Sequence, residues 1–234
     1  MVQSEQIGTS KNRIYKELRR SIIMGHSIAG ERLDVEDLAQ RYKTSVTPVR
    51  DALQMLSQEE LVSIKPRSGY FVTRITLKEL RDMLELRKIL EIAAIEQAAL
   101  CITQEQINQL KQVHAGYTGD DDEAYDRYID ENWRFHYLLA EASGNHELAL
   151  TLGKLLDRLA RFMVLRHAGK SLANSHSRII EALEANHLPA TRATLLDELD
   201  ATQDAILDGV IQEEAAFWHL NENKTVHKQP KEVA

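Results

Sequence analysis

Proline is rare in this chain of 234 residues, and its positions separate two unlike parts. Pro48 and Pro66 lie in the first 75 residues, whereas Pro189 is the single proline between Pro66 and Pro230. Proline disrupts helix interiors, so the long segment after residue 66 is free to form helices. Apolar residues recur there at spacings of three and four, as in Leu80, Met83, Leu84, Leu90, Ala94 and Ala98, and again in Leu195, Leu199 and Ile206. These patterns predict a mainly α protein.

The two parts of the chain also differ in net charge. Residues 1–75 contain 12 Lys and Arg against 9 Asp and Glu, which gives a net charge of +3. Residues 76–234 contain 17 against 27, a net charge of −10, and the two parts sum to the overall −7. A small basic module joined to an acidic body is typical of a DNA reader with a separate regulatory domain.

The composition narrows the class of protein. With 43% apolar and 28% charged residues, the chain is expected to fold into globular domains. The single cysteine, Cys101, excludes an intramolecular disulfide and indicates a reducing compartment. Residues 1–20 carry no recognisable secretory signal, and no apolar run is long enough to cross a bilayer. We therefore expect a cytoplasmic protein without a membrane partner.

Turn-forming residues set the expected element boundaries. In the first part we expect helices and then two short strands, the helices at 12–24, 34–42 and 45–57 and the strands at 61–65 and 70–73. In the second part we expect helices at about 77–99, 103–115, 120–142, 146–167, 171–186 and 190–215. The expected organisation is a DNA-binding domain over 1–75, a helical domain over 76–218 and a polar, frayed tail over 219–234.

The helix at 45–57 has the pattern of a recognition helix. Ser45 is expected to cap it, and one side carries an apolar stripe made of Val49, Ala52, Leu53 and Leu56. Thr47, Arg50 and Gln54 face the other way, near the N-terminal end that such helices present to bases and phosphates. Arg50 has the donors to hold a guanine or a phosphate with two hydrogen bonds.

The strands that follow predict a hairpin with a basic tip. Lys65, Arg67, Ser68 and Gly69 form that tip, a wing able to reach a groove or the DNA backbone. The alternative is a helical hairpin in an unrelated small α+β module, with Arg50 merely solvated.

A second group of polar residues lies in the acidic part. Asn132 and His136 are four residues apart and share one helix face, while His176 and Glu198 fall on later helices. Two imidazoles, one amide and one carboxylate from three helices could enclose a divalent metal in a bundle core. The alternative is that these are ordinary core or surface residues, since the chain holds nine histidines.

The first third of the chain resembles the winged helix-turn-helix of the GntR family of bacterial transcription regulators. The family pattern Ser-Arg-Thr-Pro-Val-Arg-Glu-Ala-Leu corresponds to Ser45–Leu53 here, and the Gly-aromatic-Val wing to Gly69–Val72. Val46 stands where the family usually has a base-reading arginine, and Glu36 where a basic residue is common. The resemblance implies DNA contact by Ser45, Val46, Thr47, Arg50 and Gln54, with Lys65, Arg67, Ser68 and Gly69 of the wing; base reading then depends mainly on Arg50 and Thr47.

Residues 78–215 resemble the FCD ligand-binding domain of the FadR-like branch of that family, an antiparallel helical bundle. The resemblance rests on Arg87-x-x-Leu90-Glu91, Phe135-His136, Ser143-Gly144-Asn145 and His176 with Ile179. Many members hold a metal with one aspartate and three histidines. By position, the aspartate is replaced here by Asn132, and the histidines fall on His136, His176 and Glu198. This implies a Zn²⁺ or Ni²⁺ site with one negative charge, with a metal-free pocket as the alternative.

The same resemblance implies an anionic effector held with the help of an arginine. Arg87 is expected to project into the pocket, so that a small carboxylate would be bound by Arg87, Asn132, His136 and His176. The alternative is an ordinary intrahelical pair between Arg87 and Glu91.

The expected function is ligand-controlled transcription. We expect a homodimeric repressor, with activation as the alternative, that binds a pseudo-palindromic operator and whose affinity for it changes when the carboxylate binds. One rival is a metal-sensing or architectural DNA-binding protein without an organic effector. Another is a metal-dependent hydrolase, but an enzyme would leave the DNA-binding module unexplained, so no catalytic residue is assigned.

Overall fold

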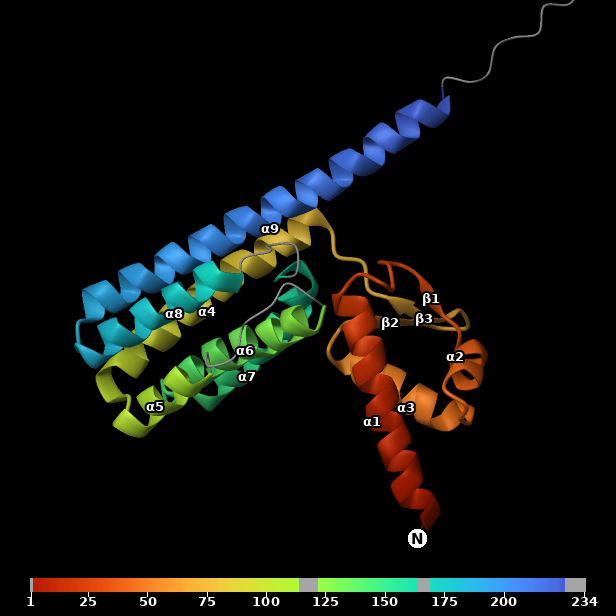
Figure 1. Ribbon diagram of the computed structural model, residues 1–234, viewed down its shortest axis with the longest axis horizontal. Helices are drawn as coiled ribbons and strands as arrows, with labels where there is room; N and C mark the ends of the chain where they lie inside the picture. Colours follow the sequence, from red (N-terminus) through yellow and green to blue (C-terminus); the bar gives the residue numbers. More distant parts are fainter. Residues whose placement is uncertain (1, 114–121, 164–168, 226–234) are drawn as a thin grey trace, which may run out of the picture.

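The computed structural model describes residues 2–113, 122–163 and 169–225, which form two structural parts (Figure 1). The N-terminal part contains, in order, α1 (Val2–Ile23), β1 (Arg32–Leu33), α2 (Val35–Arg41), α3 (Val46–Gln58), β2 (Val62–Lys65) and β3 (Gly69–Val72). The described C-terminal part is helical and contains α4 (Leu77–Cys101), α5 (Gln104–Gln112), α6 (Asp122–Glu141), α7 (His146–Met163), α8 (Gly169–Glu184) and α9 (Leu188–Thr225).

The N-terminal part is a winged helix-turn-helix. Asp34 caps α2 by accepting hydrogen bonds from the backbone N–H groups of Glu36 and Asp37. The expected apolar stripe of α3 is confirmed as fully buried: Val49, Ala52, Leu53 and Leu56. These residues pack in one core with the inward face of α1, which carries Ile14, Leu18 and Ile22. The strands form an antiparallel sheet in the order β1-β3-β2, in which Val62 lies opposite Val72 and Lys65 opposite Gly69.

The C-terminal part is a helical bundle whose long members run side by side in Figure 1. α4 begins with a capping box, in which Thr76 Oγ1 accepts from the Glu79 N–H and the Glu79 carboxylate accepts from the Thr76 N–H. Gly144 ends the turn after α6 with φ of +76°, a left-handed conformation that glycine adopts without steric cost. Apolar residues from all six described helices form the adjoining cores of the bundle. Within the described ranges, none of the helices has both the length and the apolar character needed to cross a bilayer.

The structure corrects several expected boundaries. α1 begins at Val2, ten residues before the expected start, and α9 continues to Thr225, into the segment 219–234 that was expected to be a frayed tail. β1 was not expected at all, because a two-residue strand is defined by its pairing with β3 and not by a local pattern. Ser45 does occupy the N-cap position of α3, but its side chain makes no capping hydrogen bond. The expected end of the helix over 146–167 lies in part outside the described residues.

Candidate DNA interface and buried polar cluster

The exposed face of α3 carries the residues expected to meet DNA. Thr47, Arg50 and Gln54 are exposed, and so are Ser45 and Val46 at the start of the helix. They are fixed in place because the opposite side of α3 is fully buried against α1. The start of α3 also presents backbone N–H groups and the positive end of the helix dipole, both of which favour a phosphate.

The wing lies beside this face. Arg67 at its tip has a φ of +63° and Gly69 a φ of +102°, so the chain reverses sharply and exposes Lys65, Arg67 and Ser68. A groove of about 410 Å³ joins the wing to α3, with Arg50, Lys65 and Arg67 in its wall. Arg32 of β1 also lines it, a cation that sequence reasoning missed because its strand was not expected. The structure thus gathers the expected α3 and wing residues on one side of the domain.

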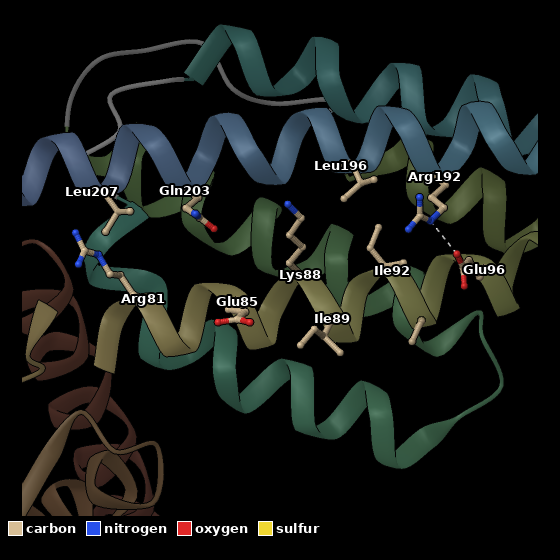
Figure 2. Close-up of a pocket in the computed structure, with 11 residues that line it drawn as sticks. Arg81, Glu85, Lys88, Ile89, Ile92, Glu96, Arg192, Leu196, Gln203 and Leu207 are labelled. Carbon is tan, nitrogen blue, oxygen red and sulfur yellow. Dashed lines mark hydrogen bonds and ion pairs between the residues drawn. The ribbon is translucent and has the colours of Figure 1, made fainter. Parts of the chain in front are cut away.

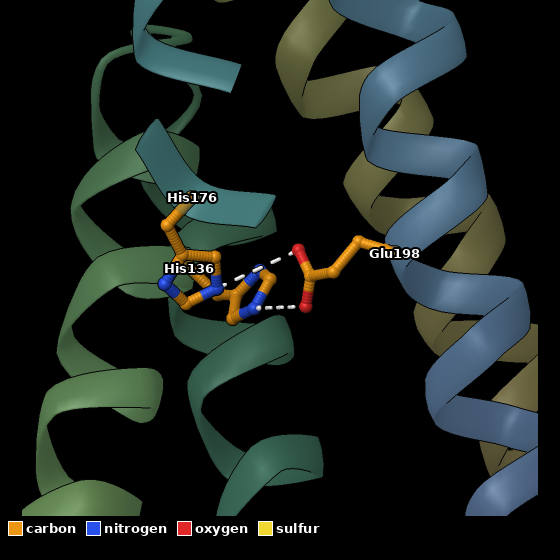
Figure 3. Close-up of side chains that lie close together, drawn as sticks. All are labelled: His136, His176 and Glu198. Atoms are coloured by element: carbon orange, nitrogen blue, oxygen red, sulfur yellow. Dashed lines mark ion pairs between the residues drawn. The ribbon is translucent and has the colours of Figure 1, made fainter. Parts of the chain in front are cut away.

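In the bundle, His136 of α6, His176 of α8 and Glu198 of α9 meet in the core (Figure 3). His136 Nε2 lies 3.4 Å from Glu198 Oε1, and His176 Nε2 lies 3.5 Å from Glu198 Oε2. All three residues are at most 2% exposed. The His176 ring stacks on Phe135, with centroids 3.8 Å apart, which fixes its orientation.

Arg87 and Glu91 of α4 extend this group into a cluster of five buried ionisable residues. The Arg87 Nε donates to Glu91 Oε1 at 2.6 Å, so the intrahelical pair considered from the sequence is present. Arg87 Nη2 also lies 3.0 Å from His136 Nε2, while the other Glu91 oxygen lies 2.5 Å from His136 Nδ1. Arg87 is only 1% exposed and lies in the bundle core, and its place in an effector pocket stays a prediction.

Charges within the cluster set the protonation of its members. Burial alone would raise the pKa of Glu198, but the imidazoles of His136 and His176 outweigh it and hold this pKa well below its usual range. Burial alone would lower the pKa of His136, yet Glu91 and Glu198 together raise it. For His176 burial dominates over Glu198, and its pKa is lowered. His136 is therefore the histidine of the pair that accepts a proton more readily.

The Arg87 contact depends on the protonation of His136. A guanidinium only donates, so Arg87 Nη2 is hydrogen-bonded to His136 Nε2 when that nitrogen carries a lone pair. In that form Nδ1 carries the proton and donates it to Glu91. A metal would need the same Nε2 lone pair, so metal binding at His136 and the Arg87 contact exclude each other.

The residues present fit a divalent metal. The candidate ligand atoms of His136, His176 and Glu198 all lie within 4.8 Å of one another. Ligands about 2.1 Å from a tetrahedral ion lie about 3.4 Å apart, which is close to the two measured separations. Each oxygen of Glu198 faces an imidazole nitrogen, at 3.4 and 3.5 Å, without a well-aligned hydrogen bond, and Oδ1 of the buried Asn132 has no hydrogen-bond partner among the described residues. Buried acceptors without donors are costly, and a cation would satisfy them.

The structure therefore brings together most of the residues expected at this site. His136, His176 and Glu198 converge, and Arg87 joins them through His136. Asn132 is buried one helical turn before His136, but only its burial and its unsatisfied oxygen connect it with the cluster. Sequence reasoning missed that Glu91 contacts His136, since that contact joins residues 45 positions apart. The one available signal was a carboxylate on the apolar face of α4.

Comparisons with known proteins agree with both parts of the fold. The description "Bacterial regulatory proteins, gntR family" matches residues 10–72, and the FCD domain matches residues 82–201. The HTH-type transcriptional repressor RspR of Escherichia coli K12 is 26% identical over 215 residues, covering 89% of this chain and 93% of RspR. The Nta operon transcriptional regulator of Aminobacter aminovorans is 30% identical over 136 residues, covering 57% of this chain and 64% of its own.

Solved structures share the architecture. E. coli McbR/YncC superposes with a TM-score of 0.66 at 20% identity, covering 87% of this chain and 98% of its own. A metal-free FCD domain of TM0439 superposes with a TM-score of 0.51 at 18% identity, covering 59% of this chain and 99% of its own. With a regulatory helix-turn-helix model and an FCD model that together span most of the described residues, the chain belongs to the GntR family of bacterial transcription regulators and carries an FCD domain.

Proposed function

We propose that this regulator is a sequence-specific repressor that acts in the cytoplasm and whose operator affinity is set by ligands of its buried cluster. The winged helix-turn-helix implies DNA binding. Repression is supported by the relative RspR of E. coli, which is described as a transcriptional repressor. Control by a ligand is supported by one observation: the candidate ligand atoms of the buried His136, His176 and Glu198 lie within 4.8 Å of one another, and the Glu198 oxygens make no well-aligned hydrogen bond among the described residues.

For the DNA interface we propose α3 and the wing. Arg50 and Thr47 are assigned to base edges, and Ser45, Val46 and Gln54 to the surface around them. Lys65, Arg67, Ser68 and Gly69 of the wing are assigned to the DNA backbone, because cations and backbone N–H groups at an exposed tip suit phosphate. The valine at position 46 offers only apolar contact, so specificity rests on few hydrogen bonds.

For the buried cluster we propose Zn²⁺ or Ni²⁺ held by His136, His176 and Glu198, with Asn132 as a weaker fourth ligand. When bound, the metal would act as a Lewis acid that attracts an anion. The fixed charges of the cluster are +1 on Arg87 and −1 on each of Glu91 and Glu198, which sum to −1 with both histidines neutral. A divalent ion makes the sum +1, and one carboxylate restores neutrality.

This charge balance supports a small monocarboxylate as the effector. The metal takes the Nε2 lone pair of His136, so Arg87 would lose its contact there and could donate to the incoming carboxylate instead. Asn132, His136 and His176 would line the other sides of the anion. Glu91 keeps its hydrogen bond to His136 Nδ1 and holds the ring in the tautomer that a metal requires.

A homodimer is proposed because two copies can match a pseudo-palindromic operator. The outer surface of α4 and α9 is the proposed contact, where a groove of about 720 Å³ lies between the two helices (Figure 2). Ile89, which is 58% exposed, lines this groove, and Leu86 of α4 and Ile211 of α9 are exposed elsewhere on the same two helices, at 43% and 50%. Arg81, Glu85 and Lys88 of α4 also line the groove.

A metal sensor without an organic effector is the second candidate. It is favoured by the ion pair between Arg87 and Glu91, which does not involve His136 Nε2 and therefore balances the charge of Arg87 without an anion. The two candidates differ in one measurable respect: the second responds to metal alone and does not change when carboxylates are added.

Selection of DNA fragments by the purified protein, followed by binding measurements with and without Zn²⁺ and a panel of small carboxylates, tests the proposal. A specific sequence whose affinity changes with metal and one carboxylate supports repression controlled by an effector. A response to Zn²⁺ alone supports the metal sensor. Equal affinity for selected and random DNA would refute sequence-specific regulation.

A further inference from the structure

The winged domain and the bundle meet at a junction built around one arginine. Arg19 of α1 lies 3.4 Å from Glu59 at the end of α3, 3.2 Å from Asp157 of α7 and 3.8 Å from Asp130 of α6. The Arg19 side chain is 18% exposed, and Glu59 and Asp157 are each 22% exposed. One cation thus joins three carboxylates that come from both domains; Asp130, at 72%, is the exposed member.

The contact reaches the recognition helix itself. Glu59 is the C-cap residue of α3, and the next residue, Glu60, forms an ion pair with Arg158 of α7 at 3.2 Å. Glu60 has a φ of +59°, a conformation that costs a side-chain-bearing residue free energy, so the chain leaves α3 in a fixed direction. A helix of 13 residues is a stiff rod about 20 Å long. Its N-terminal end carries Thr47 and Arg50, while its C-terminal end contacts α7.

The C-terminal half of α7 contacts both the winged domain and the buried cluster. Its last turns contact the winged domain through Asp157, Arg158 and the Arg161 guanidinium, which donates to the Thr73 carbonyl at 3.4 Å. Between these polar contacts, Ala160 packs with Ile23 of α1. Met163, which ends α7, lies with its sulfur 3.9 Å from Arg87 Nη1 of the buried cluster. A single helix therefore touches both the winged domain and the cluster.

We infer that the Arg19 junction is a latch that fixes the direction of the recognition helix, by tying the C-terminal end of α3 to α7. This inference rests on the proposed DNA-facing role of α3. Rotation of α3 about its anchored end would move Arg50 relative to a half-site, so the latch determines whether two recognition helices in a dimer can engage one operator. A change at Arg87 reaches the latch through Met163 and the last turns of α7.

The charges at the latch predict that losing Arg19 separates the domains more than losing Arg19 and the charge of Asp157 together. Without Arg19, the carboxylates of Glu59, Asp130 and Asp157 face one another across the domain boundary, and repulsion drives the domains apart. Neutralising Asp157 in addition removes part of that repulsion. A role for Arg19 in merely stabilising α1 would not produce this recovery.

The distance between the domains tests the latch without DNA or any ligand. Cys101 on α4 is exposed and is the chain's one cysteine, so Ser68→Cys in the wing creates a defined pair for two spin labels. The distance distribution between the labels is measured in the parent and in Arg19→Gln, Glu59→Gln, and Arg19→Gln with Asp157→Asn. Arg13→Gln is the matched control, since Arg13 lies on the same helix and pairs with Glu17 away from the junction.

We expect Arg19→Gln to shift and broaden the distribution, Glu59→Gln to broaden it less, and the double variant to recover part of the parental shape. Arg19→Lys keeps the positive charge, and its distance distribution should remain near that of the parent. Circular dichroism of each variant would reveal a folding defect. Parental distributions in both Arg19→Gln and Glu59→Gln would overturn the latch. Because no DNA or metal is present, that result would leave the proposed repressor function standing.

Discussion

His136 connects the two groups of partners in the buried cluster. Its Nδ1 faces Glu91 and its Nε2 faces both Glu198 and Arg87. A carboxylate behind a metal-binding imidazole fixes the tautomer and makes the free nitrogen a stronger ligand. The ring of His136 is therefore oriented as a metal ligand would be, and a cation at Nε2 would displace the Arg87 contact.

Replacing both His136 and His176 by alanine should abolish metal binding, because it removes the two nitrogen ligands and leaves one carboxylate and one amide. Elemental analysis after loading with Zn²⁺ or Ni²⁺ gives the metal content directly. His146→Ala is the matched control, since His146 is exposed at the start of α7. Equal metal content in the double variant and the parent would rule out this site.

Glu91→Gln should weaken metal binding without abolishing it. The amide keeps the size of the side chain but no longer favours the Nδ1–H tautomer of His136, and loss of such an outer partner typically costs about 10–100-fold in affinity. Titration with Zn²⁺ in competition with a chromogenic chelator measures the change. An unchanged affinity would mean that Glu91 serves only as the ion-pair partner of Arg87.

Among the helices, α3 and α7 connect the domain junction with the two proposed binding sites. α3 has one end at the proposed DNA surface and the other at the domain junction, and α7 has one side at the junction and its final residue beside Arg87. Figure 1 shows the winged domain at one end of the bundle, where α7 ends.

Arg50→Ala should reduce specific DNA binding by roughly 1–3 kcal/mol, the usual worth of a bidentate arginine contact. The cause is the loss of donors at the exposed N-terminal half of α3, while the buried stripe that holds the helix is unaffected. Gel-shift titrations on a selected sequence measure the change, with Lys43→Ala as a control in the preceding turn. Parental affinity in Arg50→Ala would remove it from the interface.

Asp157 should make the stability depend on pH. Burial raises its pKa to about 6, against the opposing effect of Arg19. A folded-state pKa above the unfolded value means that the folded state binds the extra proton, so this contribution is present at low pH and is lost as pH rises from about 4 through about 6. Urea unfolding at several pH values in the parent and in Asp157→Asn isolates it: the difference in the free energy of unfolding should change across that window. A constant difference would show that the carboxyl is not perturbed.

For the whole molecule, what the sequence could predict was whatever depends on neighbours along the chain. The stripe of α3 follows a 3.6-residue period, and Asp34 caps α2 within three residues, so both were visible in the pattern. Family resemblance supplied the grouping of His136, His176 and Glu198, whose helices no local signal brings together. The contact between Glu91 and His136, and the pair between Arg19 and Asp157, 138 positions apart, required the folded chain.

The same distinction explains the corrected elements. β1 exists because Arg32 and Leu33 pair with Phe71 and Tyr70, and no two-residue pattern announces such a strand. The extension of α9 to Thr225 follows from a run without proline or glycine after Gly209, which weak amphipathic spacing concealed. In the proposed function, a ligand of the buried cluster and the DNA would bind far apart, and any coupling between them would pass through packed helices.

The most direct test measures operator affinity as a function of metal in the parent and in the variant lacking His136 and His176. Coupling between the sites is expected to change the affinity of the parent for its selected DNA by about 1–3 kcal/mol when Zn²⁺ or Ni²⁺ is bound. Linkage requires the DNA to change metal affinity by the same factor. The double variant should bind the DNA with an affinity that does not respond to metal. A parent that binds metal in the bundle yet shows the same DNA affinity with and without it would contradict control by the buried cluster.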